Sequence, residues 1–183
     1  MAARLLGELL GGEGKVAVIG FMPGSASTME REEGFGEELK AKFPRMQIVQ
    51  TVFGMADRAK SLAATENILN AHPDLAGLFA DNESSSAGAV MALRSRPRTA
   101  VRTVCFDANE QLISDLRQGR IEGIVLQDPF KMGYESVKAI GMKLRGEAVP
   151  KSIDSGVVLA RKANLDKSDI TRLLQPDIKT WLQ

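Results

Sequence analysis

The chain is divided by short apolar runs that stop abruptly in polar or turn-forming residues. The clearest run, Leu75–Ala80, follows Pro73 and ends in Asp81, Asn82 and Glu83. Brief apolar runs with such ends are typical of strands buried on both faces. Three more runs break off similarly: Val18–Gly20 before a turn, Val104–Phe106 before Asp107, and Ile124–Leu126 before Gln127. The pattern predicts parallel strands whose carboxyl ends converge on one polar ligand site, the usual position in open α/β sheets.

Segments with helical periodicity separate these runs. We expect strands over 15–20, 47–53, 75–80, 101–106, 122–127 and 153–160, and helices over 2–10, about 28–43, 58–71, 84–94, 109–118, 129–145 and 168–174. Ser27 or Thr28 is expected to cap the second helix and Asp57 the third, while Gly119 ends the fifth. Such alternation indicates βαβ units. The predicted fold class is therefore α/β, a doubly wound, mainly parallel sheet.

Two stretches are expected to lie outside these elements. Ser95–Arg98 reads as a loop, and Trp181 and Leu182 fall in a carboxyl-terminal tail. At 183 residues the chain corresponds to about one domain. No repeat or long linker divides it.

The charge balance argues against nucleic acid or an anionic membrane as a partner. The formal charge is +1, from 24 basic and 23 acidic residues, so no strong field attracts such partners. No apolar run is long enough to span a bilayer. The segment 1–10 is not expected to be a signal peptide, because its apolar part is short and Glu8 interrupts it.

Covalent, metal and nucleotide chemistry find little support. Cys105, the single cysteine, lies in an apolar run and reads as a packing residue, while His72 precedes a proline at a helix end. The turn at 20–28 lacks the closely spaced glycines or the Gly-Lys-Ser/Thr ending of a phosphate loop. Metal-ligand spacings are absent as well. We therefore expect no cofactor, no metal and no enzymatic activity.

Four polar residues are suited to holding a hydroxylated ligand. Arg31 offers a fork of donors, Asp107 accepts two hydroxyl hydrogen bonds, and Asn82 and Gln127 both donate and accept. A sugar displays vicinal hydroxyls that need this mixture. In the alternative interpretation, Arg31 pairs with Glu30 or Glu32 on its own helix. Asp107 and Glu83 could also form an acid–base pair, although nothing nearby resembles a leaving-group or metal partner.

Five linked segments carry a family resemblance. They are Met29–Phe35, Ile68–Asp74, Leu78–Asn82, Val104–Asp107 and Ile121–Gln127. In order and spacing they resemble the carboxyl-terminal portion of the ribose-binding-protein family. These are type I periplasmic sugar-binding proteins, related to lactose-repressor-type effector domains. The resemblance runs from the first expected helix to about Asn164, and it implies a three-layer αβα lobe of flavodoxin-like type.

The resemblance implies a role for each candidate residue. In that family the arginine before the Glu-Gly-Phe-like segment contacts the sugar, which implies Arg31. The asparagine after the Phe-Ala strand binds a hydroxyl, which implies Asn82. The aspartate that closes the Gly-Phe-Asp-like strand takes a hydroxyl pair, which implies Asp107. The glutamine that closes the next strand lies at the hinge and reaches the ligand, which implies Gln127.

The sequence departs from the family at two positions. Ala56 stands where family members can carry an aromatic residue, with Phe53 three residues earlier, so sugar stacking from this side is in doubt. Cys105 replaces a usual glycine, which we interpret as packing. The ligand can therefore differ from ribose.

A larger departure concerns the two-lobed architecture of the family. The resemblance implies that residues 1–127 and 151–183 form the carboxyl-terminal ligand-binding lobe. Residues 128–150 would be a crossover helix that packs on the amino-terminal lobe, most of which this sequence lacks. The apolar stripe of this helix contains Phe130, Val137, Ile140 and Leu144. We expect the helix to fold back onto its own sheet or to bury the stripe in a homodimer.

The function that follows is a solute receptor of a bacterial ABC-type transporter. It would hold a monosaccharide or polyol by hydrogen bonds and deliver it to the membrane permease, and the resemblance places it in the periplasm. One alternative is the effector-binding core of a lactose-repressor-type regulator, which would need a preceding helix-turn-helix. Another is a flavodoxin-like enzyme or response module, which would need a phosphate loop or an acidic pocket where Phe21 and Met22 stand.

Overall fold

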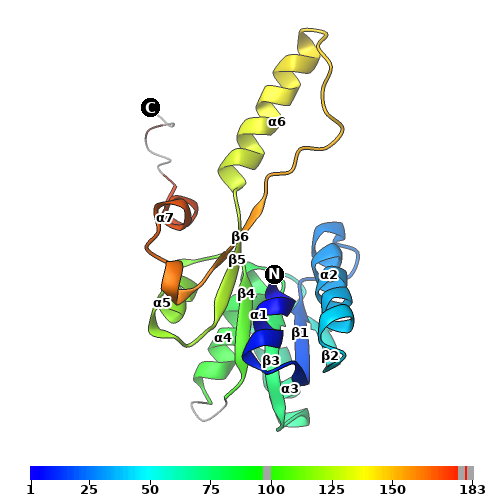
Figure 1. Ribbon diagram of the computed structural model, residues 1–183, viewed down its shortest axis with the longest axis vertical. Coiled ribbons are helices and arrows are strands. Elements are labelled where there is room, and N and C mark those ends of the chain that lie inside the picture. The colour runs from blue at the N-terminus through cyan, green and yellow to red at the C-terminus, as the bar shows by residue number, and fades with distance from the viewer. Residues whose placement is uncertain (97–99, 177–179, 181–183) are drawn as a thin grey trace.

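The computed structural model describes residues 1–96, 100–176 and 180. Its centre is a six-stranded sheet in the order β2-β1-β3-β4-β5-β6 (Figure 1). The strands are β1 (Glu13–Gly20), β2 (Arg45–Phe53), β3 (Leu75–Ala80), β4 (Arg102–Phe106), β5 (Gly123–Gln127) and β6 (Val157–Ala160). The pairs among β1 to β5 are parallel, and β6 pairs antiparallel with β5. The predicted doubly wound, mainly parallel sheet is confirmed.

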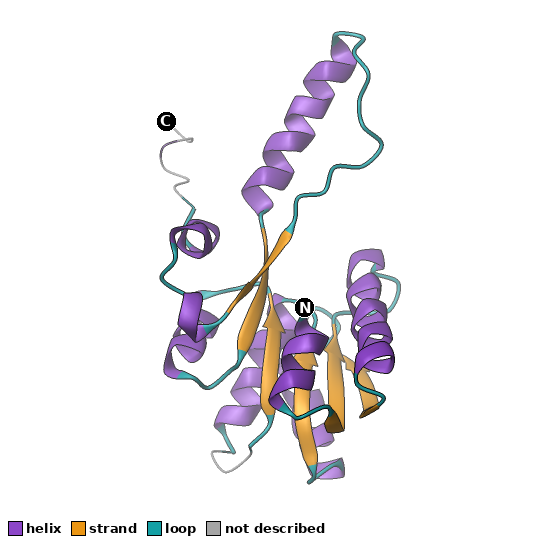
Figure 2. Cartoon of the chain, in the orientation of Figure 1, coloured by secondary structure: helices purple, strands orange, loops and turns teal. Residues whose placement is uncertain are grey.

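Helices cover both faces of this sheet (Figure 2). They are α1 (Ala2–Leu9), α2 (Ala26–Lys42), α3 (Arg58–Ala71), α4 (Glu83–Arg94), α5 (Glu110–Gln118), α6 (Pro129–Leu144) and α7 (Ser168–Leu174), with a 3₁₀ turn over Lys162–Asn164. Alternate strand residues face opposite layers. Thus Val18 packs with α1 and α2, whereas its neighbour Ile19 packs with α3 and α4. Cys105 lies on the second face beside α5, buried as predicted.

Two of the three helix caps predicted from the sequence are confirmed. Asp57 accepts a hydrogen bond from the Lys60 amide at 2.8 Å, and Gly119 ends α5 with a φ of +73°. The prediction that Ser27 or Thr28 caps α2 is wrong, because Ser25 occupies the N-cap position. Thr28 lies inside the first turn, and its hydroxyl donates to the Ser25 carbonyl at 3.1 Å.

Part of the predicted loop and tail cannot be compared with the structure. Positions 97 and 98 of the loop and the tail residues Trp181 and Leu182 lie outside the described residues. Over the ranges that are described, no helix is long and apolar enough to cross a membrane.

Helix α6 stands away from the rest of the domain (Figure 1). None of its residues is buried, and the side chains of Val137 and Leu144 are 70% and 83% exposed. The prediction that this helix folds back onto its own sheet is therefore wrong. The sheet offers no free face to receive it, because α1 and α2 cover one side and α3, α4 and α5 the other.

Candidate functional site

The carboxyl ends of the parallel strands meet at one edge of the sheet. The register pairs Ile19 of β1 with Ala80 of β3, and Phe106 of β4 with Val125 of β5. The residues that follow these strands must therefore emerge close together. This is the edge at which open α/β sheets bind small molecules.

Three of the four predicted residues form a cluster at this edge. The amide of Gln127 donates to Asp107 Oδ1 at 2.8 Å, and Arg31 Nη1 lies 3.6 Å from Asp107 Oδ2. The Arg31 guanidinium also stacks on the Phe106 ring at 3.8 Å from its centroid, a favourable cation–π arrangement. The Asp107 and Gln127 side chains are half-buried, so they remain accessible to a ligand.

Arg31 reaches this cluster across the sheet from α2. Its Nη1 donates to the backbone carbonyl of Asp81 at 2.8 Å, which fixes the guanidinium between the ends of β3 and β4. The alternative pairing with Glu30 or Glu32 does not occur, since Asp107 is its ion-pair partner within the described residues. Arg31 is thus held from two sides, by a carbonyl and an aromatic face.

Asn82 lies at the same edge, but its contacts are local. Its Oδ1 accepts from the Ser85 amide at 2.9 Å, so it is the N-cap of α4, and its amide nitrogen lies 3.3 Å from the Ser84 hydroxyl. Asn82 directly follows Asp81, the residue that holds Arg31, and this places it beside the cluster.

Ser85 and Ser86 tie the strand ends together, a role that the sequence analysis missed. Both are fully buried. The Ser85 hydroxyl donates to the Gly20 carbonyl at 3.1 Å, and the Ser86 hydroxyl donates to the Phe106 carbonyl at 3.1 Å. A run of small hydroxyl residues at the start of a helix that directly follows a buried strand is the signal that could have indicated this role.

A second missed feature is the pair of acids Asp81 and Glu32. Asp81 is fully buried, and its Oδ1 and the Glu32 Oε1 have no hydrogen-bond partner. Burial, followed by the neighbouring Glu32 carboxyl, raises the pKa of Asp81 to about 7. An aspartate placed directly after a fully buried strand could have indicated an unusual acid.

The possible acid–base pair of Asp107 and Glu83 does not form. Glu83 pairs with Arg58 at 2.6 Å and also accepts a hydrogen bond from Asn109, whereas Asp107 is engaged by Arg31 and Gln127. Cys105 lies in the core, where burial raises the pKa of its thiol to about 12. A thiol with so high a pKa is not a nucleophile at neutral pH.

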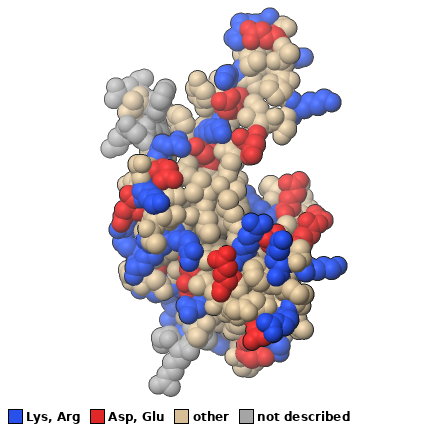
Figure 3. Space-filling view, in the orientation of Figure 1, with Lys and Arg blue, Asp and Glu red and all other residues tan. Residues whose placement is uncertain are grey.

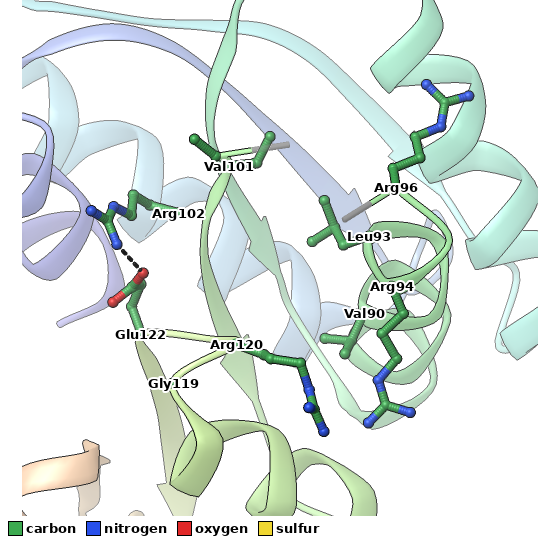
Figure 4. A pocket seen from close by; sticks show the side chains of 10 residues that line it. Val90, Leu93, Arg94, Arg96, Val101, Arg102, Gly119, Arg120 and Glu122 are labelled. Atoms are coloured by element: carbon green, nitrogen blue, oxygen red, sulfur yellow. Dashed lines mark hydrogen bonds and ion pairs between the residues drawn. The ribbon is translucent and has the colours of Figure 1, made fainter. Parts of the chain in front are cut away.

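A cavity of about 580 Å³ lies near the amino ends of β4 and β5 (Figure 4). Its polar lining is dominated by arginines, of which Arg94 and Arg120 both bind the buried carboxylate of Asp115 at 2.5 Å. Arg102 pairs with Glu122 at 2.8 Å. This cavity is at the opposite end of the strands from Arg31 and Asp107, and Arg94, Arg102 and Arg120 already have acidic partners.

The drawn face of the molecule has a mixed charge, and the described residues contain no group of metal ligands. On the face in Figure 3, basic and acidic side chains are interspersed, in keeping with the small net charge. Among the described residues, no three histidine, cysteine, aspartate or glutamate side chains gather as a metal site.

Comparison with known proteins points to one family. Residues 1–148 match the model of the periplasmic binding protein domain. The chain is 31% identical over 159 residues to the ribose import binding protein RbsB of Bacillus subtilis, covering 87% of this chain and 51% of that protein. It is 32% identical over 161 residues to the D-ribose/D-allose-binding protein of Pseudomonas aeruginosa, covering 85% and 50%.

Solved structures agree with these relatives. An ABC transporter solute-binding protein from Agrobacterium vitis with bound D-fucose superposes with a TM-score of 0.90 at 32% identity, covering 94% of this chain and 59% of that one. A carbohydrate transporter solute-binding protein from Agrobacterium radiobacter in complex with D-arabinose gives 0.89 at 29% identity, covering 94% and 60%. The chain spans about half the length of the curated relatives it matches.

Proposed function

Because this chain belongs to the periplasmic binding protein domain family, we propose that it binds a monosaccharide or related polyol for an ABC-type import system. The relatives are import binding proteins for ribose and apiose, and structural neighbours hold sugars. They favour this function over the regulator core. The observation that carries the proposal is the cluster of Arg31, Asp107 and Gln127 at the carboxyl edge of the sheet.

Each residue of the site has a defined task in this proposal. The Asp107 carboxylate accepts hydrogen bonds from two neighbouring hydroxyls, with Gln127 fixing its orientation through Oδ1. Arg31 donates to a ring or hydroxyl oxygen while Asp81 and Phe106 hold its guanidinium. Asn82 offers its amide to a further hydroxyl. The ligand is bound and released by hydrogen bonds, with no covalent step and no cofactor.

The relatives also support the proposed partners and compartment. The ligand passes to a membrane permease, as in the ABC transport systems to which the structural neighbours belong. The family whose domain model matches supports function in the periplasm. Nucleic acid is no partner in this proposal.

The exposed stripe of α6 also finds an explanation in this proposal. Residues 1–127 and 151–183 act as one ligand-binding lobe, and residues 128–150 provide a crossover helix that packs on another lobe. The exposure of Val137, Ile140 and Leu144 supports this, since apolar side chains at helical spacing are normally covered. In a sample of this chain alone, a second copy can cover the same stripe.

A thermal-shift screen with D-ribose, D-allose, D-apiose, D-arabinose and D-fucose tests the ligand class. We expect weak stabilisation that grows with the logarithm of sugar concentration, because one lobe supplies only part of the contacts. Asp107→Ala should abolish the shift. Asp166→Ala, at an exposed position near α5, is the matched control and should retain it.

Two outcomes would contradict the proposal. One is stabilisation by nucleotides or flavin with none by sugars, and the other is an unchanged sugar shift in Asp107→Ala. Submicromolar sugar binding by the monomer in calorimetry would contradict the expected weakness of a single lobe.

A further inference from the structure

Two carboxyl groups with unpaired oxygens lie beneath the edge of the sheet that carries Arg31, Asp107 and Gln127, which we call the ligand edge. Asp81 Oδ1 and Glu32 Oε1 are both buried and lack a hydrogen-bond donor. Glu32 Oε1 lies beside Gly20 at the end of β1, and Asp81 accepts from the amide of the next residue, Phe21, so the two carboxyls flank the same point of the chain. Ionised carboxylates only accept hydrogen bonds, so a hydrogen bond between the two is favourable when one of them carries a proton.

Asp81 also connects the turn after β1 with the Arg31 side chain. Its Oδ2 accepts from the Phe21 amide at 3.1 Å, which holds the turn after β1. Its backbone carbonyl accepts from Arg31 at 2.8 Å. Glu32 is the next residue after Arg31 on α2, so the pair and the guanidinium belong to the same turn of helix.

The surroundings leave the pair few ways to accommodate a second negative charge. Arg31 is the nearby cation, and it is engaged by Asp107 after β4. On the side of α3 and α4, Arg58 is engaged by Glu83 at 2.6 Å. Glu32 Oε1 also lies tightly against β1, since a methyl group at Gly20 would come within 2.8 Å of it.

We propose that Glu32 and Asp81 share one proton, and that Asp81 in this protonated pair is a positioning residue for Arg31 and the Phe21 turn. Loss of the proton places two carboxylates side by side beneath the site. Their repulsion, and the attraction of each for Arg31, then draw the guanidinium away from Asp107. The role in ligand affinity rests on the proposed function, whereas the sharing of the proton does not.

The direction of the pH effect follows from the burial of Asp81. Burial and Glu32 raise the pKa of Asp81 to about 7. The protonated pair is the form that holds Arg31. The affinity for the sugar therefore has its full value below this pH and falls as the pH rises through it. We expect roughly a three- to tenfold loss of affinity between pH 6 and pH 8.5, since a shift of one pKa unit corresponds to a factor of ten.

The sharing of the proton is tested by NMR titration of the full chain without ligand. The carboxyl carbon of Asp81, the Phe21 amide and the Arg31 side-chain N–H signals should shift with one midpoint near pH 7. Asp81→Asn should remove this step, because its amide donates permanently to Glu32. The Phe21 and Arg31 signals should then stay at the positions they have in the wild type at pH 6.

The effect on affinity is tested by calorimetry with D-ribose between pH 6 and pH 8.5. Asp81→Asn and Glu32→Gln should keep the affinity of pH 6 at every pH, whereas Glu33→Gln, an exposed neighbour on α2, should retain the wild-type profile. Circular dichroism would confirm that the variants fold.

The proposal is overturned if the Asp81 carboxyl shows no step between pH 5.5 and 8.5. It is also overturned if Asp81 titrates while the Phe21 and Arg31 signals stay unchanged. Failure of D-ribose and the other sugars to bind counts against the proposed function alone, because the NMR signals report the pair without a ligand.

Discussion

The ligand edge and helix α6 differ in where their stabilising contacts come from. At the edge, Arg31, Asp107 and Gln127 contact one another and the core of the same domain. Helix α6 has an apolar stripe but no buried residue. The edge is therefore organised by contacts within the domain, whereas the domain leaves the apolar stripe of α6 exposed. Substitutions in the two regions should differ accordingly in their effect on unfolding.

The largest expected difference is between Phe79→Ala and Val137→Ala. Phe79 is buried beneath the edge and stacks on Phe35 at 4.6 Å between centroids. Its truncation leaves a cavity and should lower the free energy of unfolding by about 3–5 kcal/mol. Val137 is mostly exposed on α6, and its truncation should change that free energy by less than about 0.5 kcal/mol. Urea denaturation of both variants checks this, and similar losses would break the comparison.

The inner strands of the sheet were predictable because they are buried on both faces. Leu75–Ala80 reads as an apolar run with clear ends, and the structure places β3 over those residues. The N-cap of α2 was not predictable, because the turn before it contains several hydroxyl residues. The choice of Ser25 depends on the backbone of that turn, in which Gly24 has a φ of +85°. The residue types in the turn alone do not determine which hydroxyl residue caps α2.

The second largest expected effect is a pH dependence of stability that comes from the edge and not from α6. The pKa of Asp81 is raised to about 7 in the folded protein and is about 4 in an unfolded chain. The folded state therefore binds the proton more tightly, and stability falls as the pH rises from about 4 to 7. We expect a loss of roughly 1–3 kcal/mol between pH 5 and pH 8 from this group.

Thermal or urea unfolding across this pH range measures the effect. Asp81→Asn should flatten the decline, while Glu135→Gln on α6 should leave it unchanged. Parallel curves for the wild type and Asp81→Asn would show that Asp81 does not titrate in this window.

The candidate site was only partly predictable. Arg31, Asn82, Asp107 and Gln127 stand next to strand ends or in a segment with a family resemblance, so their sequence positions indicated them. The pairing of Asp81 with Glu32 joins residues far apart in the chain and depends on how α2 lies across β1 and β3. The position of α6 could not be predicted, because its stripe alone does not specify what covers it.

A smaller effect distinguishes the two tasks of Asn82. Asn82→Ala removes the acceptor for the Ser85 amide and should lower the free energy of unfolding by about 1 kcal/mol, as for other N-caps. Asn82→Asp keeps that acceptor and should cost less than about 0.5 kcal/mol. If Asn82 also donates to a sugar hydroxyl, both variants should weaken sugar binding in the thermal-shift screen. Unchanged sugar binding in Asn82→Asp would limit this residue to capping.

The smallest effect on unfolding is expected from α6 itself. Replacing Val137, Ile140 and Leu144 together by glutamine keeps good helix formers at each position and removes no buried contact of the domain. We expect a change of less than about 1 kcal/mol in the free energy of unfolding. The same variant should lose any concentration-dependent association that the wild type shows in sedimentation equilibrium.

Met91→Gln, at an exposed apolar position on α4, is the matched control and should leave that association unchanged. The two measurements together locate the partner of the stripe. If the triple variant unfolds much more easily as a monomer, the stripe is covered by its own domain and the contrast with the ligand edge disappears. If stability is kept and association is lost, the stripe of α6 is an interface with a surface outside the domain.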